Sequence, residues 1–248
     1  MYNSNFEMEN VLNNSSVSVS EAFPVLMRKV YVWMTLALII TGFTAYSVAH
    51  SPGMLMTILG NKVLFYGLLI AEFILVLSLS AAIQKLSIVV ATLMFLLYSV
   101  INGLTLSVCF IAFTESSIAN VFFITAGTFS VMALVGYTTK TDLTSLGKML
   151  FFALIGLVIA TLVNVFFIKS GGFDLIISCV GVLIFVGLTA YDSQKIKEML
   201  MMAPDAGSGM QKLALFGALT LYLDFINLFL HLLHIFGEED KRLMMASF

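Results

Sequence analysis

Three acidic side chains lie in or beside stretches of this sequence that are otherwise apolar. Glu72 and Asp224 are each near the middle of an apolar run, and Asp192 stands where another run ends, in "LTAYDSQKIK". A charge at the centre of a membrane-spanning helix costs about 2.5–3.5 kcal/mol on insertion scales. Such an acid is expected to face the interior of a helix bundle, to pair with another group or to bind a proton.

The neighbours of Asp224 continue the polar pattern along one helix face. Asp224, Asn227 and His231 fall at positions i, i+3 and i+7, so their side chains share one stripe, whereas Phe225 and Phe229 lie elsewhere. A helix with a polar stripe inside lipid is expected to be surrounded by other helices. The stripe therefore predicts that the span containing Asp224 is the central one.

Simpler interpretations of these residues stay open. Glu72 would also serve as a single hydrogen-bonded acid that locks its span to the neighbours, and Asp192 as an ordinary solvated acid at a span end. His231 and His234 resemble a metal pair, but helical ligand pairs are more often four residues apart and no third ligand is evident. No resident metal or cofactor is expected.

The composition is that of an integral membrane protein. Hydrophobic residues make up 60% of the 248 positions and charged residues 10%, whereas an ordinary soluble domain is about 25% charged. The mean hydropathy is +1.04. A net charge of −2 argues against a polybasic protein that binds nucleic acid. The polar first 29 residues lack a basic signal-peptide region, so the first span is expected to act as an uncleaved targeting signal.

Seven apolar runs are long enough to cross about 30 Å of hydrocarbon as helices. We predict an all-α polytopic membrane protein in which the last span is central and the other six surround it. Residues 1–29 are predicted to form a mobile cytoplasmic tail, residues 30–236 the transmembrane domain and residues 237–248 a short polar tail. The runs are Val30–Ala49, Val63–Ala82, Ile88–Phe113, Ile118–Tyr137, Met149–Ile168, Phe173–Tyr191 and Leu213–Phe236.

The basic residues favour one orientation. The side of the first residue carries Arg28, Lys29, Lys85, Lys140, Lys148, Lys195, Lys197 and Lys212, and the other side carries Lys62, Lys169, Lys241 and Arg242. Because cytoplasmic loops are enriched in Lys and Arg, the N-terminus is predicted to be cytoplasmic and the C-terminus outside.

Several motifs resemble the Bax inhibitor-1 (transmembrane Bax inhibitor motif) family. They are "LDFINLF" in the last span, "LIFVGLTAYDSQKIK" at the end of the sixth, "INGLTLS" in the third and "GYTTKTDLTSLGKMLFFALIGLVIATLVNVF" across the fourth and fifth. The resemblance covers about Arg28 to Phe236. The compact chain with short tails is similar to bacterial members, which implies the bacterial cytoplasmic (inner) membrane.

The resemblance implies a seven-helix fold with an enclosed last helix, and a pH-sensitive calcium leak across the lipid bilayer. By motif, its pH sensor and gate would be Asp192 and Asp224, with Glu72 also on the ion path. The family's basic partner near the end of the second helix has no clean counterpart here, and Lys85 is the nearest cation.

The chemistry of carboxyl groups is compatible with that role. Two carboxyl groups within hydrogen-bond range cannot both ionise cheaply, so they share a proton whose gain or loss changes the force between their helices. Their hard oxygen ligands suit Ca²⁺, which predicts transient calcium near Asp192 and Asp224. Calcium ions and protons are thus the expected small partners.

The two aspartates can meet only if their helices are longer than the apolar runs. We expect the sixth helix to continue through "SQKIKEMLMM" and the seventh to begin well before the bilayer. The "APDAGSG" stretch would form the turn between them.

Two other functions compete with the leak. A regulator that transports nothing would bind other membrane proteins, such as a membrane protease complex, through the polar N-terminal segment. An intramembrane aspartyl protease would need Gly-x-Gly before its second aspartate, where this chain has "TLYLD". We therefore expect no enzymatic activity.

Overall fold

The computed structural model describes residues 2–202 and 207–237, and all of the regular structure in them is helical. Each helix satisfies its own backbone, which a lipid environment requires. The elements are α1 (Tyr2–Ala49), α2 (Pro52–Gly60), α3 (Lys62–Ala82), α4 (Ile88–Leu106), α5 (Cys109–Ala112), α6 (Glu115–Thr138), α7 (Thr144–Val163), the π-helical turn η1 (Asn164–Ile168), α8 (Gly171–Met201) and α9 (Ser208–Phe236).

Seven of the described helical segments are long and apolar enough to cross a membrane. The predicted number of spans is confirmed. The third span covers Ile88–Ala112, close to the predicted run, but it is not one continuous helix, because α4 ends at Leu106 and the short helix α5 follows after a break.

Polar side chains fix where several helices begin. Asn61, Ser87, Thr114 and Ser170 each accept a hydrogen bond from a backbone N–H in the first turn of the following helix. Such caps satisfy N–H groups that have no partner within the helix. At the other end of α7, Asn164 accepts from the backbone N–H of Ser170 at 3.1 Å and donates to Asp174 at 2.9 Å. These two bonds join α7 to α8 in a tight reversal.

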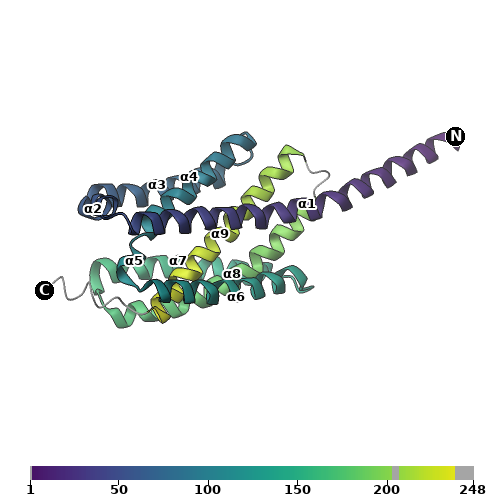
Figure 1. Ribbon diagram of the computed structural model, residues 1–248. Coiled ribbons are helices and arrows are strands. Elements are labelled where there is room, and N and C mark those ends of the chain that lie inside the picture. Colours follow the sequence, from purple (N-terminus) through teal and green to yellow (C-terminus); the bar gives the residue numbers. More distant parts are fainter. Residues whose placement is uncertain (1, 203–206, 238–248) are drawn as a thin grey trace.

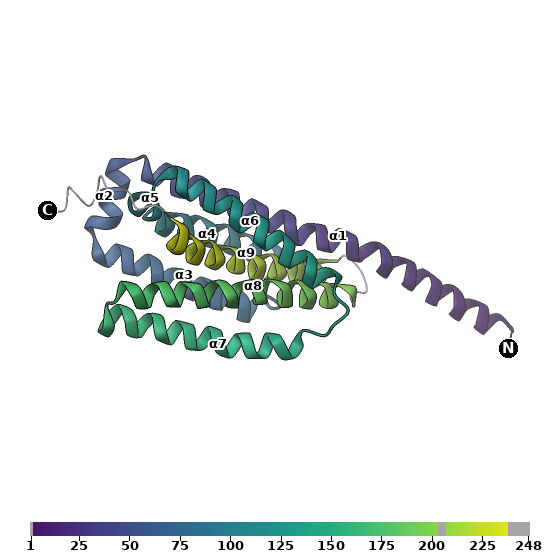
Figure 2. The same cartoon turned by 90° about the horizontal axis from the view of Figure 1, so that it is seen from below.

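The last helix is the centre of the bundle, as the polar stripe predicted. The most apolar window of α9 is 67% buried, whereas that of α3 is 6% buried. α9 packs mainly on α8, α1, α6 and α4, while α3 packs on α4 and α7 on α8. In Figure 1, α9 crosses between α1 above and α6, α7 and α8 below; in Figure 2, it lies between α1 and α6 on one side and α3, α7 and α8 on the other.

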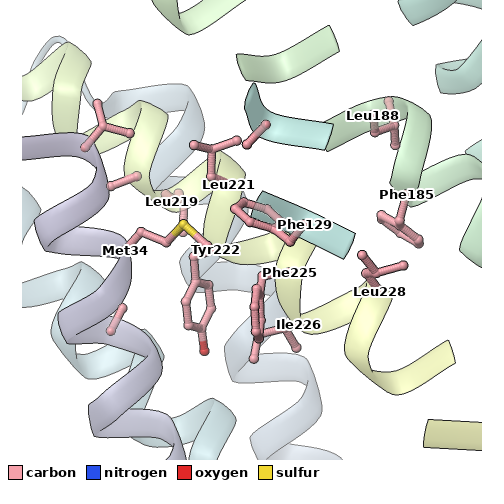
Figure 3. Packing of buried hydrophobic residues seen from close by; sticks show 14 of the residues in the cluster. Met34, Phe129, Phe185, Leu188, Leu219, Leu221, Tyr222, Phe225, Ile226 and Leu228 are labelled. Atoms are coloured by element: carbon pink, nitrogen blue, oxygen red, sulfur yellow. The ribbon is translucent and has the colours of Figure 1, made fainter. Parts of the chain in front are cut away.

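The core is built around the large side chains of α9. Leu221, Tyr222 and Leu228 are fully buried, and Phe225 is nearly so. Figure 3 shows Phe225 next to Phe129 of α6, and the centroids of the two rings are 5.5 Å apart. Because one helix supplies so much of the core, its register positions every side chain that it carries.

The terminal segments were predicted as tails. α1 begins at Tyr2, so the segment before Arg28 is helical and continuous with the first span (Figure 1). Its cytoplasmic placement remains a prediction. Residues 238–248 of the predicted C-terminal tail, and residues 203–206 of the predicted turn, lie outside the described residues.

Candidate functional site

The two aspartates are brought together by the long helices that contain them. α8 continues for about two and a half turns past Asp192, and α9 begins more than four turns before Asp224. The predicted extension of both helices beyond the apolar runs is confirmed. α8 and α9 form the most extensively packed pair of helices, and Asp192 and Asp224 interact with each other and line the same cavity between them.

A side-chain hydrogen bond joins Asp192 to Asp224. Asp224 is 5% exposed, and Asp192 is half-buried. A carboxylate only accepts hydrogen bonds, so this contact requires a proton on one of the two groups. Among the described side chains, Asp192 is the one hydrogen-bond partner of Asp224, and Asp224 Oδ2 is buried without a partner there. The buried acid therefore depends on the shared proton.

A cavity of about 860 Å³ reaches this pair from the side of α3 and α7. Its lining includes both aspartates and, from α3, Phe73 and Ser80. The other titratable groups that line it are Tyr191 and Lys195 of α8 and Lys148 of α7.

The cation beside the pair is Lys195, not Lys85. Lys195 attracts Asp192 electrostatically, and its Nζ lies 5.5 Å from the centre of the Tyr191 ring. Lys85 is exposed in the turn after α3 and does not line the cavity. The sequence reasoning missed Lys195, although its i, i+3 spacing from Asp192 places the two side chains on one helix face.

Glu72 lies in a different cluster, at the seam between α3 and α4. Thr105 donates a hydrogen bond to Glu72 Oε1 at 2.6 Å, and the Asn102 side chain bonds the same carboxyl. Tyr222 donates to Asn102 Oδ1 at 3.0 Å, and its hydroxyl lies 2.7 Å from Thr41 Oγ1. This polar network links α1, α3, α4 and α9, and it does not include either aspartate.

The predicted polar stripe of α9 lines the aspartate cavity and a smaller cavity beside it. Asn227 borders both the aspartate cavity and a second cavity of about 290 Å³, which His231 also lines. The His231 ring stacks on Phe185 with centroids 5.7 Å apart. It fits because α8 has Gly181 there, where a Cβ would lie 2.5 Å from His231 Nε2. Asn227 donates to Leu223 of its own helix.

The two aspartates are the only acids that line the cavity among the described residues. A closed Ca²⁺ site uses about six to eight oxygen ligands, which is more than two carboxyl groups supply. Within the described ranges, no group of three His, Cys, Asp or Glu side chains is arranged to hold a metal ion. The arrangement can hold and release a proton and can attract a cation.

Comparisons with known proteins agree with the fold. Residues 24–241 match the family described as inhibitor of apoptosis-promoting Bax1. The chain is 50% identical to the inner membrane protein YbhL of Escherichia coli K12, over 92% of this chain and 97% of that protein. It is 44% identical to a protein of Borreliella burgdorferi, over 86% and 91% of the two chains. It is 36% identical to a membrane protein of Streptococcus pyogenes serotype M1, over 93% and 98%. With its seven spans and a match over most of its length, the chain is an integral multi-pass membrane protein of the Bax inhibitor-1 family.

Proposed function

We propose that this protein is a pH-sensitive, calcium-permeable leak channel gated by the Asp192–Asp224 pair, with no enzymatic activity. One observation carries the proposal: two acids from adjacent helices share a hydrogen bond at the wall of a cavity inside the membrane region. Glu72 and Asp224 are the acids proposed for the ion path. By analogy with the inner membrane relative, we propose the bacterial inner membrane as its location, with the N-terminus cytoplasmic.

The gate would work through the shared proton. With one proton between them, the carboxyl groups hold α8 against α9. Loss of that proton puts two negative charges side by side in a poorly solvated place, which pushes the helices apart. Lys195 and Lys148 moderate this repulsion on the cavity side, so the net force depends on both cations as well as on the acids.

A leak is better served by weak, successive sites than by a closed cage. The acid pair offers carboxylate oxygens to a passing Ca²⁺, and Asn227 and His231 continue the polar wall toward the other end of the bundle. Glu72 is already hydrogen-bonded by neutral donors in the α3–α4 seam, so its contribution to permeation needs a separate test.

Calcium uptake into liposomes that contain only this protein tests the proposal across about pH 6 to 8. A gate controlled by one proton changes flux by up to about tenfold per pH unit. In Asp192→Asn and Asp224→Asn this dependence is expected to flatten, because an amide does not titrate. Glu72→Gln is expected to reduce flux and to keep the pH dependence.

Asp142→Asn is the matched control. Hydrogen bonds from the side chain and backbone of Thr144 hold the pKa of Asp142 below its usual range, so this exposed acid stays ionised in the tested interval. Flux equal to that of empty liposomes would overturn the channel proposal. An unchanged pH response in the double amide variant would overturn the gate.

A second function, a regulator that binds other membrane proteins, is favoured by the shape of α1. The N-terminal part of α1 projects beyond the bundle (Figures 1 and 2), where it is available to another protein. Affinity capture from membranes before and after deletion of residues 1–20 tests this function. A partner that is lost with the deletion, together with no flux in liposomes, would favour the regulator.

A further inference from the structure

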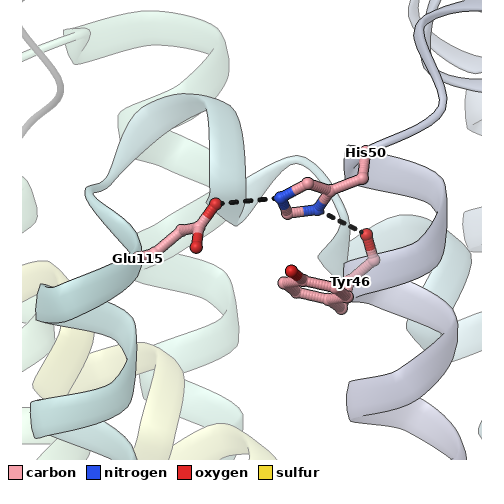
Figure 4. Close-up of polar contacts among 3 residues, drawn as sticks. All are labelled: Tyr46, His50 and Glu115. Atoms are coloured by element: carbon pink, nitrogen blue, oxygen red, sulfur yellow. Dashed lines mark hydrogen bonds and ion pairs between the residues drawn. The ribbon is translucent and has the colours of Figure 1, made fainter.

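α1 and α6 run antiparallel and meet at their two ends. At one end the rings of Phe23 and Tyr137 stack with centroids 6.5 Å apart. At the other end His50 Nε2 lies 3.1 Å from Glu115 Oε1, and His50 Nδ1 contacts the backbone oxygen of Tyr46 at 2.9 Å (Figure 4). Between these ends both helices pack on α9, α1 also packs on α4 and α6 on α8, and the two helices make few contacts with each other.

A long groove lies between the two helices. It consists of two cavities of about 430 and about 750 Å³, which share Leu38 of α1, Phe122 of α6 and Phe225 of α9 as lining residues. Phe225 is the most deeply buried of these three, and it packs next to Phe129 in Figure 3. We call this feature the α1–α6 groove; aliphatic and aromatic side chains form most of its surface.

The two ends of the groove carry opposite charges. Arg28 lines the larger cavity and Glu115 the smaller one. Arg28 is exposed, and among the side chains that the structure describes (residues 22–58, 60–202 and 207–237) it has no hydrogen-bond or ion-pair partner. Along α1, Arg28 and Leu38 are separated by about 15 Å, which is half the thickness of the hydrocarbon core. A lipid chain that extends from Arg28 to Leu38 would therefore cover about one leaflet, with Arg28 at the outer edge of the cavity.

We propose that the Arg28 half of the α1–α6 groove binds an anionic glycerophospholipid, with its phosphate at Arg28 and an acyl chain along α9. The apolar lining suits the chain, and the free guanidinium suits the phosphate, which it can bind with two hydrogen bonds. Glu115 at the far end repels an anionic headgroup, so the charges fix the direction of the lipid. Basic pockets between spanning helices recognise anionic headgroups in this way.

The lipid would contact α9 on the face away from the acid pair. Phe225 lines the groove, and its neighbour Asp224 lines the other cavity. The proposed site shares no lining residue with the aspartate cavity, so it does not depend on the channel proposal.

Native mass spectrometry of the full-length protein in detergent, titrated with phosphatidylglycerol or phosphatidylcholine, tests the headgroup contact. We expect phosphatidylglycerol to bind about fivefold more tightly than phosphatidylcholine. One basic residue near an anionic headgroup contributes about 1 kcal/mol, which corresponds to that factor. Arg28→Gln is expected to abolish that preference. Lys29→Gln is the matched control, because Lys29 is adjacent in sequence but does not line the groove. Equal binding of the two lipids by the wild-type protein would overturn the proposal.

A second pair of variants tests the position of the chain. Ser130 of α6 lines the groove, and its exposed neighbour Val131 does not. Ser130→Phe is expected to weaken both lipids, while Val131→Phe leaves them unchanged; equal effects of the two variants would place the lipid elsewhere. Soluble glycerol phosphate, which has no acyl chain, should not displace the lipid. If it does, the acyl chain is not required for binding and the proposal is wrong.

The oligomeric state tests another occupant of the groove. If the protein is a dimer that Ser130→Phe dissociates, the groove binds a second copy of this protein instead of a lipid.

Discussion

Two faces of α9 carry buried polar groups, and the two are satisfied in different ways. On one face the Tyr222 hydroxyl bonds Asn102 and lies against Thr41, in a network that extends to Glu72. On the other face Asp224 has, among the described residues, only another acid as its hydrogen-bond partner. The first cluster has neutral donors and acceptors in place, whereas the second needs a proton from outside.

This difference separates a fully bonded scaffold from the switch that we propose. A fully bonded buried network makes the packing of its helices specific and rigid. A carboxyl pair holds only while its proton is present, so it responds to pH. Glu72 belongs to the bonded cluster, so its proposed part in the ion path depends on the flux measured for Glu72→Gln.

Removal of the Tyr222 side chain should have the largest effect on stability. Tyr222→Ala deletes a fully buried ring, against which Phe95 and Tyr98 pack edge-on, each with a centroid distance of 5.8 Å. We expect the free energy of unfolding in detergent to fall by about 3–5 kcal/mol. Tyr222→Phe keeps the ring and should lose about 1–3 kcal/mol. A loss below about 1 kcal/mol in the alanine variant would mean that this face is not the scaffold.

Thr105→Val should have a smaller effect on the same face. The variant keeps the side-chain volume but removes the donor to Glu72, and we expect a loss of about 1–3 kcal/mol. Thr125→Val is the control, because the buried Thr125 hydroxyl bonds only a carbonyl of its own helix. Equal losses in the two variants would show that the bond to Glu72 has no special weight.

Asp224→Asn should change the free energy of unfolding less than Thr105→Val does. Its main effect should be on how that free energy depends on pH. In the wild-type protein the Asp192–Asp224 bond is lost as pH rises and the shared proton leaves. An amide donates to Asp192 without that proton, so the variant should stay within about 1 kcal/mol of wild type near neutral pH. Unfolding followed from about pH 5 to 8 should show a decline for the wild-type protein and a flat profile for the variant. Parallel profiles would contradict the switch.

The smallest effect is expected for an ion pair that belongs to neither face. His50 and Glu115 are 44% and 61% exposed at the ends of α1 and α6. Exposed pairs contribute about 0–1 kcal/mol, so thermal unfolding of His50→Gln should be nearly that of the wild-type protein. A loss as large as that of Thr105→Val would show that this end contact matters as much as the buried network.

The sequence was most informative where the lipid environment restricts what a residue can do. Runs of apolar residues predict spans, and the Asp224–Asn227–His231 stripe predicted a central helix because lipid leaves a polar stripe no other place. The same reasoning placed Asp192 against Asp224 once both helices were extended. The short helices α2 and α5 were not predicted, since brief elements depend more on packing than on periodicity.

The rest of the site depended on contacts across the bundle. Tyr222 lies in an apolar sequence context, and only the packing of α1 and α4 gives its hydroxyl partners. The choice of Lys195 over Lys85 depends on the direction of each side chain, which sequence position alone does not give. The α1–α6 groove has no sequence signal, because it results from how far apart two helices rest on α9.

The Asn164 reversal has a consequence for how the cavity opens. Because Asn164 bonds Ser170 and Asp174 across the turn, α7 and α8 are tied together and should move as one rigid body. If Asp192 releases Asp224, α8 would carry α7 with it, and the distance between those two walls would stay constant. The cavity would then widen between α3 and the α7–α8 pair. The distance between spin labels on α3 and α7 should therefore increase, while the distance between labels on α7 and α8 should stay the same.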